Sequence, residues 1–312
     1  RLADHGREGR LMHPEFLHRG STERSSPIGV HAGLLVGDWT PESGRRAIGA
    51  AASIGFDLIE IPAPDDPDAS AWTADLLDEH GIDAVVSLAL DADSDITDQA
   101  TAGRGEERLL AAVRFAEAIG ARYVGGVTYS AMRKYEHAAD AAARSRSLDV
   151  LRRVAAAAAP AGVVVGAEYV NRYESNLLNT AAQTAAFLRE LDAPNVLLHL
   201  DTFHAHLEEV DLASAVRDAG DLLGYLHASE NHRGELGTGS TDWTGLAAAL
   251  ADSGYRGPLT LESFSPAVQP PASAEGMGLW RELWHDPVAL ATSGHAFLAD
   301  LLDTDPAARR RP

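Results

Sequence analysis

Eight short apolar runs, separated by longer segments of helical character, are the feature that most constrains the fold of this chain. The runs are rich in the β-branched, leucine and aromatic residues typical of strands, and their starting points lie 27 to 40 residues apart, which leaves room for one helix and two loops between successive runs. Strands are therefore predicted over residues 28–32, 56–61, 84–90, 123–127, 163–169, 196–201, 223–228 and 259–263. Several intervening segments open with a capping residue or Pro and close near Gly or Pro, which predicts helices over residues 41–54, 106–119, 138–159, 180–191 and 244–253.

Several of the expected strands, such as VVVGAEY and VLLHLD, are apolar almost throughout instead of alternating between apolar and polar residues. Both faces of such strands must be covered, which is typical of a parallel sheet flanked by helices. Eight successive strand and helix units in 312 residues predict the α/β class and a single (β/α)8 TIM barrel. A doubly wound sheet of eight strands is the alternative layout.

One domain accounts for most of the chain, because no glycine-rich linker divides it. Residues 1–27 are polar and lack steady periodicity, so we expect a poorly ordered N-terminal extension there. The TIM-barrel catalytic domain is expected over residues 28–305, followed by a tail over residues 306–312.

The charge of the chain excludes several classes of partner. With 46 acidic and 26 basic residues the formal net charge is −20, so the protein should repel nucleic acids and anionic membranes. The absence of cysteine excludes disulfides, thiolate metal sites and cysteine nucleophiles. No apolar stretch approaches the ~18 residues of a membrane span, and no secretory signal is recognisable. We therefore expect a cytoplasmic protein that acts on a small molecule.

Potential metal ligands stand at the ends of the last four expected strands, as Glu168, Asp201, His227 and Glu262. In a parallel barrel the carboxyl ends of all strands open on one face, so these side chains should converge on one point. Three oxygen donors and one imidazole nitrogen, without sulfur, suit Mn²⁺, Mg²⁺ or Co²⁺ better than a structural zinc site. The sequence therefore predicts one divalent cation at this face.

Four motifs at these strand ends make the chain recognisable. The segments GAEYVNRYESNLLNT, HLDTFHAHLEE, HASENHRGELGTGS and LESF, with GVTYSAMRKY earlier in the chain, resemble the ketose 3-epimerases, the group named for D-tagatose 3-epimerase and D-psicose (D-allulose) 3-epimerase. That group belongs to the xylose-isomerase-like TIM barrels. The resemblance extends from about residue 28 through the GLWRELW segment and leaves out only the first 27 residues.

The resemblance implies an isomerase that epimerises free ketoses, such as D-tagatose, D-fructose or L-ribulose, at C3 through an enediolate. It implies that Glu168, Asp201, His227 and Glu262 bind one divalent ion per subunit, with Mn²⁺ as the expected ion and Co²⁺ or Mg²⁺ as alternatives. Deprotonation and reprotonation of C3 need acid/base groups on both faces of that carbon, and Glu168 and Glu262 are the expected catalytic pair. The resemblance assigns substrate binding to three further residues, Glu174, His204 and Arg233. It also suggests a homodimer or homotetramer.

Other functions stay open at this stage. An aldose-ketose isomerase of the same superfamily, of the hydroxypyruvate or L-rhamnose type, would use the same ion but give an aldose product. An apurinic-site endonuclease would need a multi-zinc cluster and a basic groove, which the net charge of −20 disfavours. A sugar-sensing barrel without catalysis has no support, because both expected proton-transfer carboxylates are present. The chain also departs from the family pattern at two places. It has VHAGLLVGDW where relatives often carry a short aromatic-bearing segment after the first strand, and HAHLEE where HMNIEE is more usual, and these differences leave the preferred sugar open.

Overall fold

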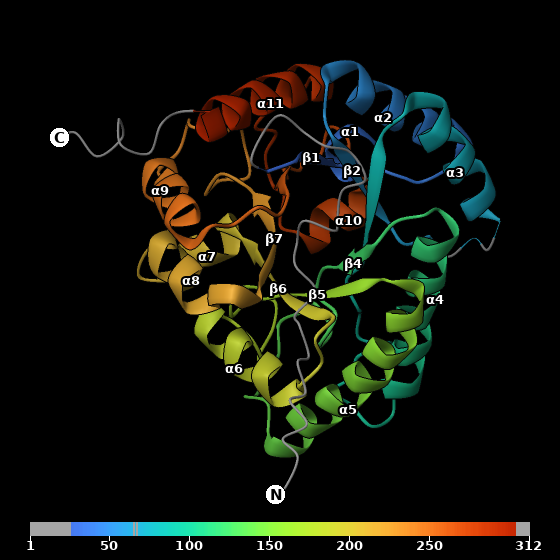
Figure 1. Ribbon diagram of the computed structural model, residues 1–312, viewed down its shortest axis with the longest axis vertical. Helices are drawn as coiled ribbons and strands as arrows, with labels where there is room; N and C mark the ends of the chain where they lie inside the picture. The colour runs from blue at the N-terminus through green and yellow to red at the C-terminus, as the bar shows by residue number, and fades with distance from the viewer. Residues whose placement is uncertain (1–25, 65, 67, 304–312) are drawn as a thin grey trace, which may run out of the picture.

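Eight parallel strands close into a barrel in the computed structural model, which describes residues 26–64, 66 and 68–303 (Figure 1). Each strand pairs with its neighbours in chain order, and the first pairs with the last. The strands are β1 (Ile28–His31), β2 (Leu58–Pro62), β3 (Asp83–Ser87), β4 (Tyr123–Gly125), β5 (Val164–Glu168), β6 (Val196–Asp201), β7 (Leu223–Ala228) and β8 (Leu259–Leu261). The predicted single (β/α)8 TIM barrel is confirmed, and the doubly wound alternative is wrong.

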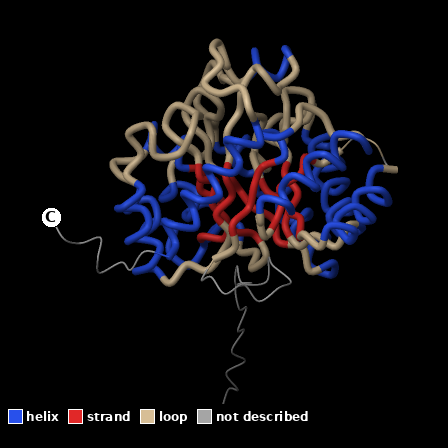
Figure 2. Tube along the Cα trace, turned by 90° about the horizontal axis from the view of Figure 1, so that it is seen from above, coloured by secondary structure: helices blue, strands red, loops and turns tan. Residues whose placement is uncertain are grey.

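Helices follow every strand and surround the barrel, with loops gathered beyond the strand ends (Figure 2). They are α1 (Ala32–Leu35), α2 (Pro41–Ile54), α3 (Ala69–His80), α4 (Ala102–Ala118), α5 (Ala141–Ala158), α6 (Ala181–Leu191), α7 (Thr202–Glu208), α8 (Leu212–Ala219), α9 (Trp243–Ser253), α10 (Pro271–Gly276) and α11 (Pro287–Asp303). Within the described ranges, none of these helices has the length and apolar character needed to cross a bilayer.

Local capping signals fix the ends of α2, whose bounds agree with the prediction. The Thr40 hydroxyl accepts a hydrogen bond from the backbone N–H of Ser43, while the Ser43 hydroxyl accepts one from the backbone N–H of Thr40. Pro41 occupies the first helical position, where its missing N–H costs nothing. Gly55 then ends the helix in the left-handed conformation.

Two separate apolar clusters hold the barrel together. The larger one packs the helices against the outer faces of the strands. The smaller one contains residues of β2 to β7 and none of the helices, which places it inside the barrel; its members are Leu58, Val85, Tyr123, Val164, Leu197 and Tyr225. The barrel interior is therefore filled by side chains at this level.

The inner faces of the strands become polar toward their carboxyl ends. Side chains on one face of a strand recur every second residue. Two positions beyond Leu58, Leu197 and Tyr225 stand Glu60, His199 and His227, all buried. The sequence thus fills the barrel with apolar side chains below and with titratable ones above, where the cavity opens.

Strands β3 and β4 are shorter than predicted, and Gly126 accounts for the end of β4. It has a φ of +98°, outside the range of a regular strand, so β4 ends at Gly125 instead of continuing to residue 127. A Cβ atom at Gly126 would lie 2.2 Å from the carbonyl oxygen of Leu88, just past the end of β3. Only glycine allows this close approach between the two chain segments.

The ends of the predicted domain lie partly outside the described residues. Residues 1–25 of the expected extension lie outside the described part of the chain. So do residues 304–312, which include the expected tail and the expected domain boundary at 305. Ser26 and Pro27 are described and buried, and the carbonyl of Pro27 accepts a hydrogen bond from Leu259 at 2.9 Å. These two residues, which the prediction assigned to the extension, pack against the barrel.

Candidate active site and metal centre

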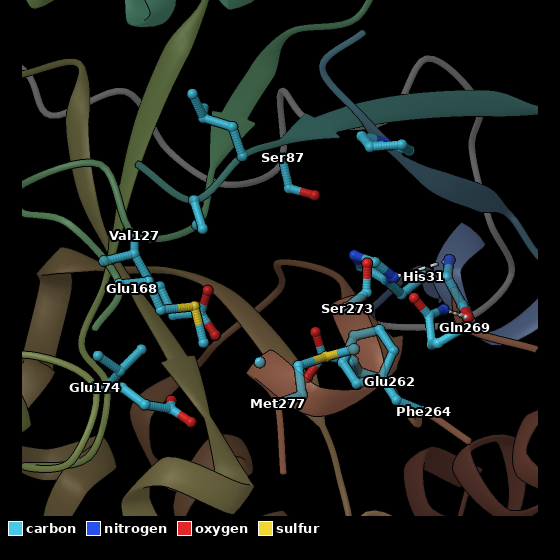
Figure 3. Close-up of a pocket in the computed structure, with 18 of the residues that line it drawn as sticks. His31, Ser87, Val127, Glu168, Glu174, Glu262, Phe264, Gln269, Ser273 and Met277 are labelled. Carbon is cyan, nitrogen blue, oxygen red and sulfur yellow. Dashed lines mark hydrogen bonds between the residues drawn. The ribbon is translucent and has the colours of Figure 1, made fainter. Parts of the chain in front are cut away.

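A cavity of about 790 Å³ opens at the carboxyl ends of the strands (Figure 3). Six of the seven site residues predicted from the sequence line it, namely Glu168, Glu174, His204, His227, Arg233 and Glu262. The seventh, Asp201, is fully buried beneath them. All the predicted residues therefore belong to one site.

The four predicted metal ligands come from successive strands, as expected. Glu168 ends β5, Asp201 ends β6, His227 is the penultimate residue of β7, and Glu262 directly follows β8. The Nδ1 atom of His227 lies 3.3 Å from Glu168 Oε1 and 3.4 Å from Glu262 Oε1. Two carboxylates from opposite ends of this row of strands thus face the same imidazole nitrogen.

The donor atoms of the predicted ligands are of the kind that a divalent cation binds. They form overlapping groups of three residues instead of one group of four. The ligand atoms of Asp201, His227 and Glu262 lie within 4.8 Å of one another, and Glu168 forms similar groups with its own neighbours. His227 Nδ1 is buried and has no hydrogen-bond partner among the described residues, although it faces two acids. A buried nitrogen without a partner, surrounded by carboxylates, is the arrangement that a hard cation completes. The cluster could therefore hold a divalent metal ion.

Arg233 lies against two of these ligands. Its guanidinium donates to Asp201 Oδ2 at 3.0 Å and also contacts the Glu262 carboxylate. Its backbone is held in the left-handed region with a φ of +61°, which is unusual for a residue other than glycine. The Ser263 hydroxyl donates to the Arg233 carbonyl at 2.5 Å, and the guanidinium stacks 4.0 Å above the ring of Phe203. These contacts hold the strained backbone of Arg233 in place and direct its guanidinium into the site.

The environment separates the pKa values of the two glutamates. Burial raises the pKa of Glu168. Burial acts in the same direction on Glu262, but the charges of His227 and Arg233 outweigh it and lower the pKa of that carboxyl. Two carboxyl groups whose pKa values are pushed apart are suited to act as an acid and a base in one reaction.

The pKa values of the other two predicted ligands are also strongly shifted. Burial raises the pKa of Asp201 to about 8, although the charge of Arg233 opposes this shift. Burial alone would lower the pKa of His227, but the surrounding carboxylates raise it well above its usual value. The metal-free cluster therefore retains protons that a bound cation would replace.

A second group of residues fixes His204. The Asn171 amide and backbone N–H groups both point at His204 Nδ1, at 2.9 and 3.3 Å, so that nitrogen accepts and the ring proton resides on Nε2. His204 Nε2 lies 3.5 Å from Asp201 Oδ2 and 3.4 Å from Arg233. Burial and the charge of Arg233 lower the pKa of His204 well below its usual value, so the ring is neutral. Glu174 lies on the other side, with Oε2 at 3.6 Å from His204 Nδ1.

Two residues of the site escaped the sequence prediction. Glu60 on β2 is fully buried, and its Oε2 atom accepts hydrogen bonds from His227 Nε2 and Tyr225 OH, both at 2.8 Å. Burial would raise the pKa of Glu60, but His227 reverses this and lowers it to about 2. His31, at the end of β1, lines the cavity and lies 3.7 Å from Glu60 Oε1. A lone acid inside the apolar run LIEIP was the signal that could have identified Glu60.

His199 stands two residues before Asp201 and therefore shares its face of β6. It is fully buried, its ring centroid lies 4.1 Å from that of His227, and its Nδ1 atom lies 3.9 Å from Glu168 Oε2. Burial lowers its pKa well below the usual value. His199 is therefore a neutral neighbour of the predicted metal ligands and lies beneath the cavity.

Known proteins are similar to this chain in both fold and sequence. The family model described as Xylose isomerase-like TIM barrel matches residues 48–283. The L-ribulose 3-epimerase of Methylomonas sp. is 42% identical over 273 residues, which cover 86% of this chain and 96% of that protein. The ketose 3-epimerase of Arthrobacter globiformis is 41% identical over 278 residues, covering 88% and 96% of the two chains. A crystal structure of D-allulose 3-epimerase from Methylomonas sp. in complex with D-allulose superposes with a TM-score of 0.86 at 40% identity, covering 91% of this chain and 99% of that chain.

The fold and the converging carboxylates define a sugar-isomerising enzyme of the xylose-isomerase-like TIM barrel class. Within that class, the chain belongs to the ketose 3-epimerases, which are isomerases that invert C3 of free ketoses. The resemblance drawn from the four motifs is confirmed.

Proposed function

We propose that this chain epimerises free ketoses at C3 with one divalent cation held by Glu168, Asp201, His227 and Glu262. Mn²⁺ is the proposed ion, with Co²⁺ or Mg²⁺ as alternatives, because three carboxylates and one imidazole favour hard or borderline cations. Such a cation would act as a Lewis acid that polarises the C2 carbonyl and makes the C3 proton more acidic. The proposed substrates are the D-fructose and D-allulose pair, D-tagatose and L-ribulose.

Glu168 and Glu262 are the proposed proton-transfer pair. One of them removes the C3 proton from one face of the sugar, and the other returns a proton to the opposite face of the enediolate. Their pKa values are shifted in opposite directions, raised for Glu168 and lowered for Glu262, which suits a pair of groups that remove and return a proton. The two exchange roles when the reaction runs in reverse.

Three further residues are proposed to bind the carbonyl end of the ketose. His204 presents Nε2–H and Arg233 presents a guanidinium, and both stabilise negative charge that develops on O2. Glu174 has a buried Oε2 atom without a hydrogen-bond partner in the described part of the chain, and it would accept a hydrogen bond from a substrate hydroxyl.

One observation carries this proposal: Glu168 and Glu262 reach the same buried nitrogen of His227 from different strands, at 3.3 and 3.4 Å. Figure 3 shows both carboxylates entering the cavity. Two carboxylates that approach one point from different strands support this proposal, because epimerisation needs one group to remove the proton and a second to return it, whereas a one-sided transfer needs only one.

Product analysis tests the proposal directly. The chain, freed of metal and reloaded with Mn²⁺, is incubated with D-fructose, D-tagatose and L-ribulose, and the products are separated by chromatography. We expect ketoses inverted at C3 and no aldose. An aldose product would indicate isomerisation between C1 and C2, and failure of added Mn²⁺, Co²⁺ and Mg²⁺ to support turnover would contradict the metal site.

An exposed aromatic side chain bears on the assembly state of the protein. The two tryptophans of the segment WRELW differ in exposure: Trp284 is buried in the core, whereas Trp280 is 78% exposed. An exposed indole of this size is suited to contact another subunit. We propose a homodimer or homotetramer, which light scattering coupled to size-exclusion chromatography would distinguish from a monomer.

A further inference from the structure

We propose that Glu60 is a positioning residue of the metal centre, which fixes the tautomer and orientation of His227 so that Nδ1 faces Glu168 and Glu262. This inference rests on the proposed metal site, and it assigns a role to a residue on β2 that contributes no ligand of its own.

The first step concerns the hydrogen bond itself. Glu60 Oε2 lies 2.8 Å from His227 Nε2, and both side chains are almost completely buried. An ionised carboxylate can only accept, so the proton of this bond belongs to Nε2 of the imidazole. When the ring is neutral, Nδ1 then carries the lone pair, and that atom lies 3.3 Å from Glu168 and 3.4 Å from Glu262. Outer partners of this kind orient metal-binding histidines and increase the basicity of the ligand nitrogen.

The second step concerns what holds Glu60. Its Oε2 atom also lies 2.8 Å from the Tyr225 hydroxyl, which in turn lies 2.5 Å from the Thr260 hydroxyl. Because Tyr225 donates its single proton to Glu60, Thr260 must donate to Tyr225. The hydrogen bonds therefore run in one direction, from β8 through β7 to the carboxylate on β2. The carboxylate is anchored by rigid strands, not by a loop.

The other oxygen of Glu60 also faces a donor. His31 Nδ1 accepts a hydrogen bond from the backbone N–H of Gly33 at 3.0 Å, so the neutral ring carries its proton on Nε2. That atom lies 3.7 Å from Glu60 Oε1, which has no hydrogen-bond partner in the described residues. The carboxylate is thus placed between two histidines, one at the cavity wall and one in the ligand set. A neutral amide in its place would turn an NH₂ group toward one of these donors.

Titration with Mn²⁺ tests the inference. Metal-free wild-type protein and Glu60→Gln are titrated by isothermal calorimetry, and folding is checked by circular dichroism. We expect Glu60→Gln to raise the Kd for Mn²⁺ about 10- to 100-fold. The matched control is Asp95→Asn, which also neutralises a buried acid, one that binds Thr97 and Tyr135 away from the ligand set. Asp95→Asn should leave the Kd for Mn²⁺ at its wild-type value.

A second readout separates positioning from general destabilisation. In protein labelled with ¹⁵N-histidine and loaded with diamagnetic Mg²⁺, the wild type should show His227 as the Nε2–H tautomer with a strongly hydrogen-bonded proton. Glu60→Gln should lose that proton signal, and Tyr225→Phe, which keeps the carboxylate but removes one donor to it, should weaken Mn²⁺ binding to a smaller extent.

The outcomes are distinct. A folded Glu60→Gln variant with wild-type Mn²⁺ affinity and an unchanged His227 signal would overturn the inference while leaving the proposed function intact. If that variant does not fold, Tyr225→Phe decides, and unchanged Mn²⁺ affinity in it overturns the inference. A wild-type protein that binds no Mn²⁺, Co²⁺ or Mg²⁺ would overturn the metal site and this inference together.

Discussion

The guanidinium of Arg233 donates to Asp201 at 3.0 Å, although the sequence assigns one residue to the substrate and the other to the metal. Asp201 is completely buried, and an uncompensated carboxylate there would cost several kcal/mol. Its other oxygen accepts the backbone N–H of Phe203 at 2.8 Å and so caps α7. Arg233 offsets part of this cost, but burial still outweighs its charge and favours the protonated form of Asp201.

Metal affinity should therefore depend on pH. Burial raises the pKa of Asp201 to about 8, so below that pH the metal-free protein holds a proton on this carboxyl. Coordination requires the ionised form, so metal uptake releases the proton. The Kd for Mn²⁺ should increase as the pH falls from 8 to 6, by up to about tenfold per pH unit for each proton released.

Calorimetric titrations at pH 6, 7, 8 and 9 measure this dependence. Repeating them at pH 7 in two buffers with different ionisation enthalpies gives the number of protons released. A Kd that stays constant between pH 6 and pH 8, with no dependence of the heat on the buffer, would contradict the raised pKa of Asp201.

The proposed catalytic pair makes a separate prediction. Glu168→Gln and Glu262→Gln would each remove the proposed proton-transfer group on one face of the sugar and preserve the size of the side chain. Each should lower kcat for C3 epimerisation by about 10²- to 10⁴-fold. Deuterium incorporation at C3 from D₂O, followed by NMR, measures the proton transfer itself.

The control for these variants is Glu230→Gln. Glu230 is also a buried acid after β7, but its carboxylate binds the Trp243 indole at 3.0 Å and backbone N–H groups of the adjoining loop. It should lose some stability and retain normal exchange. Near-normal deuterium incorporation in either catalytic variant, measured with metal bound, would rule out the two-carboxylate scheme.

The strand ends were predictable because a parallel barrel brings them to one face whatever the sequence between them. Glu168, Asp201 and His227 each close an apolar run, and the structure places all three in overlapping groups of potential ligands at the same face of the barrel. Glu60 was not predictable in the same way, because it stands inside a strand and its partner His227 is 167 residues away. The acid within LIEIP marks a buried polar position, but its role depends on which side chain of a distant strand faces it across the closed barrel.

Element bounds followed the same division between local and tertiary causes. The bounds of α2 matched the prediction because Thr40 and Gly55 fix both ends through neighbours in the chain. Those of β4 did not, because Gly126 leaves the strand to accommodate the carbonyl of Leu88, a contact that spans two strands. The orientation of Arg233 likewise depends on a left-handed backbone that no sequence pattern indicates.

The tautomer of His204 gives a third prediction, through Asn171→Asp. The side-chain oxygen Oδ1 of Asn171 already accepts the N–H of Tyr173 at 3.0 Å, so its amide NH₂ must face His204 Nδ1. An aspartate would present a carboxylate there and draw the single ring proton to Nδ1. His204 Nε2 would then lose its proton, and with it the donor proposed for the substrate oxygen.

Asn171→Asp should lower kcat by about 10²-fold, the usual effect of removing one donor to a developing negative charge. Asn195→Asp is the control, since that buried amide donates to the Ala155 carbonyl at 2.9 Å, at the opposite end of the strand from Asp201. Steady-state kinetics of the two variants, normalised to folded protein, provide the comparison. Equal activities would contradict the role of His204 as a donor.

The contact between β3 and β4 gives the last prediction, through a pair of glycine substitutions. Gly126 and Gly162 both have positive φ values, +98° and +67°. A Cβ at Gly126 would lie 2.2 Å from the backbone oxygen of Leu88, whereas a Cβ at Gly162 would meet nothing within 4 Å. Gly162→Ala should therefore cost only the conformational strain, about 1 kcal/mol of unfolding free energy, and Gly126→Ala should cost about 3 kcal/mol or more because backbone must also move. Urea denaturation followed by circular dichroism measures both values, and equal losses of stability would show that the close approach to Leu88 does not restrict this position to glycine.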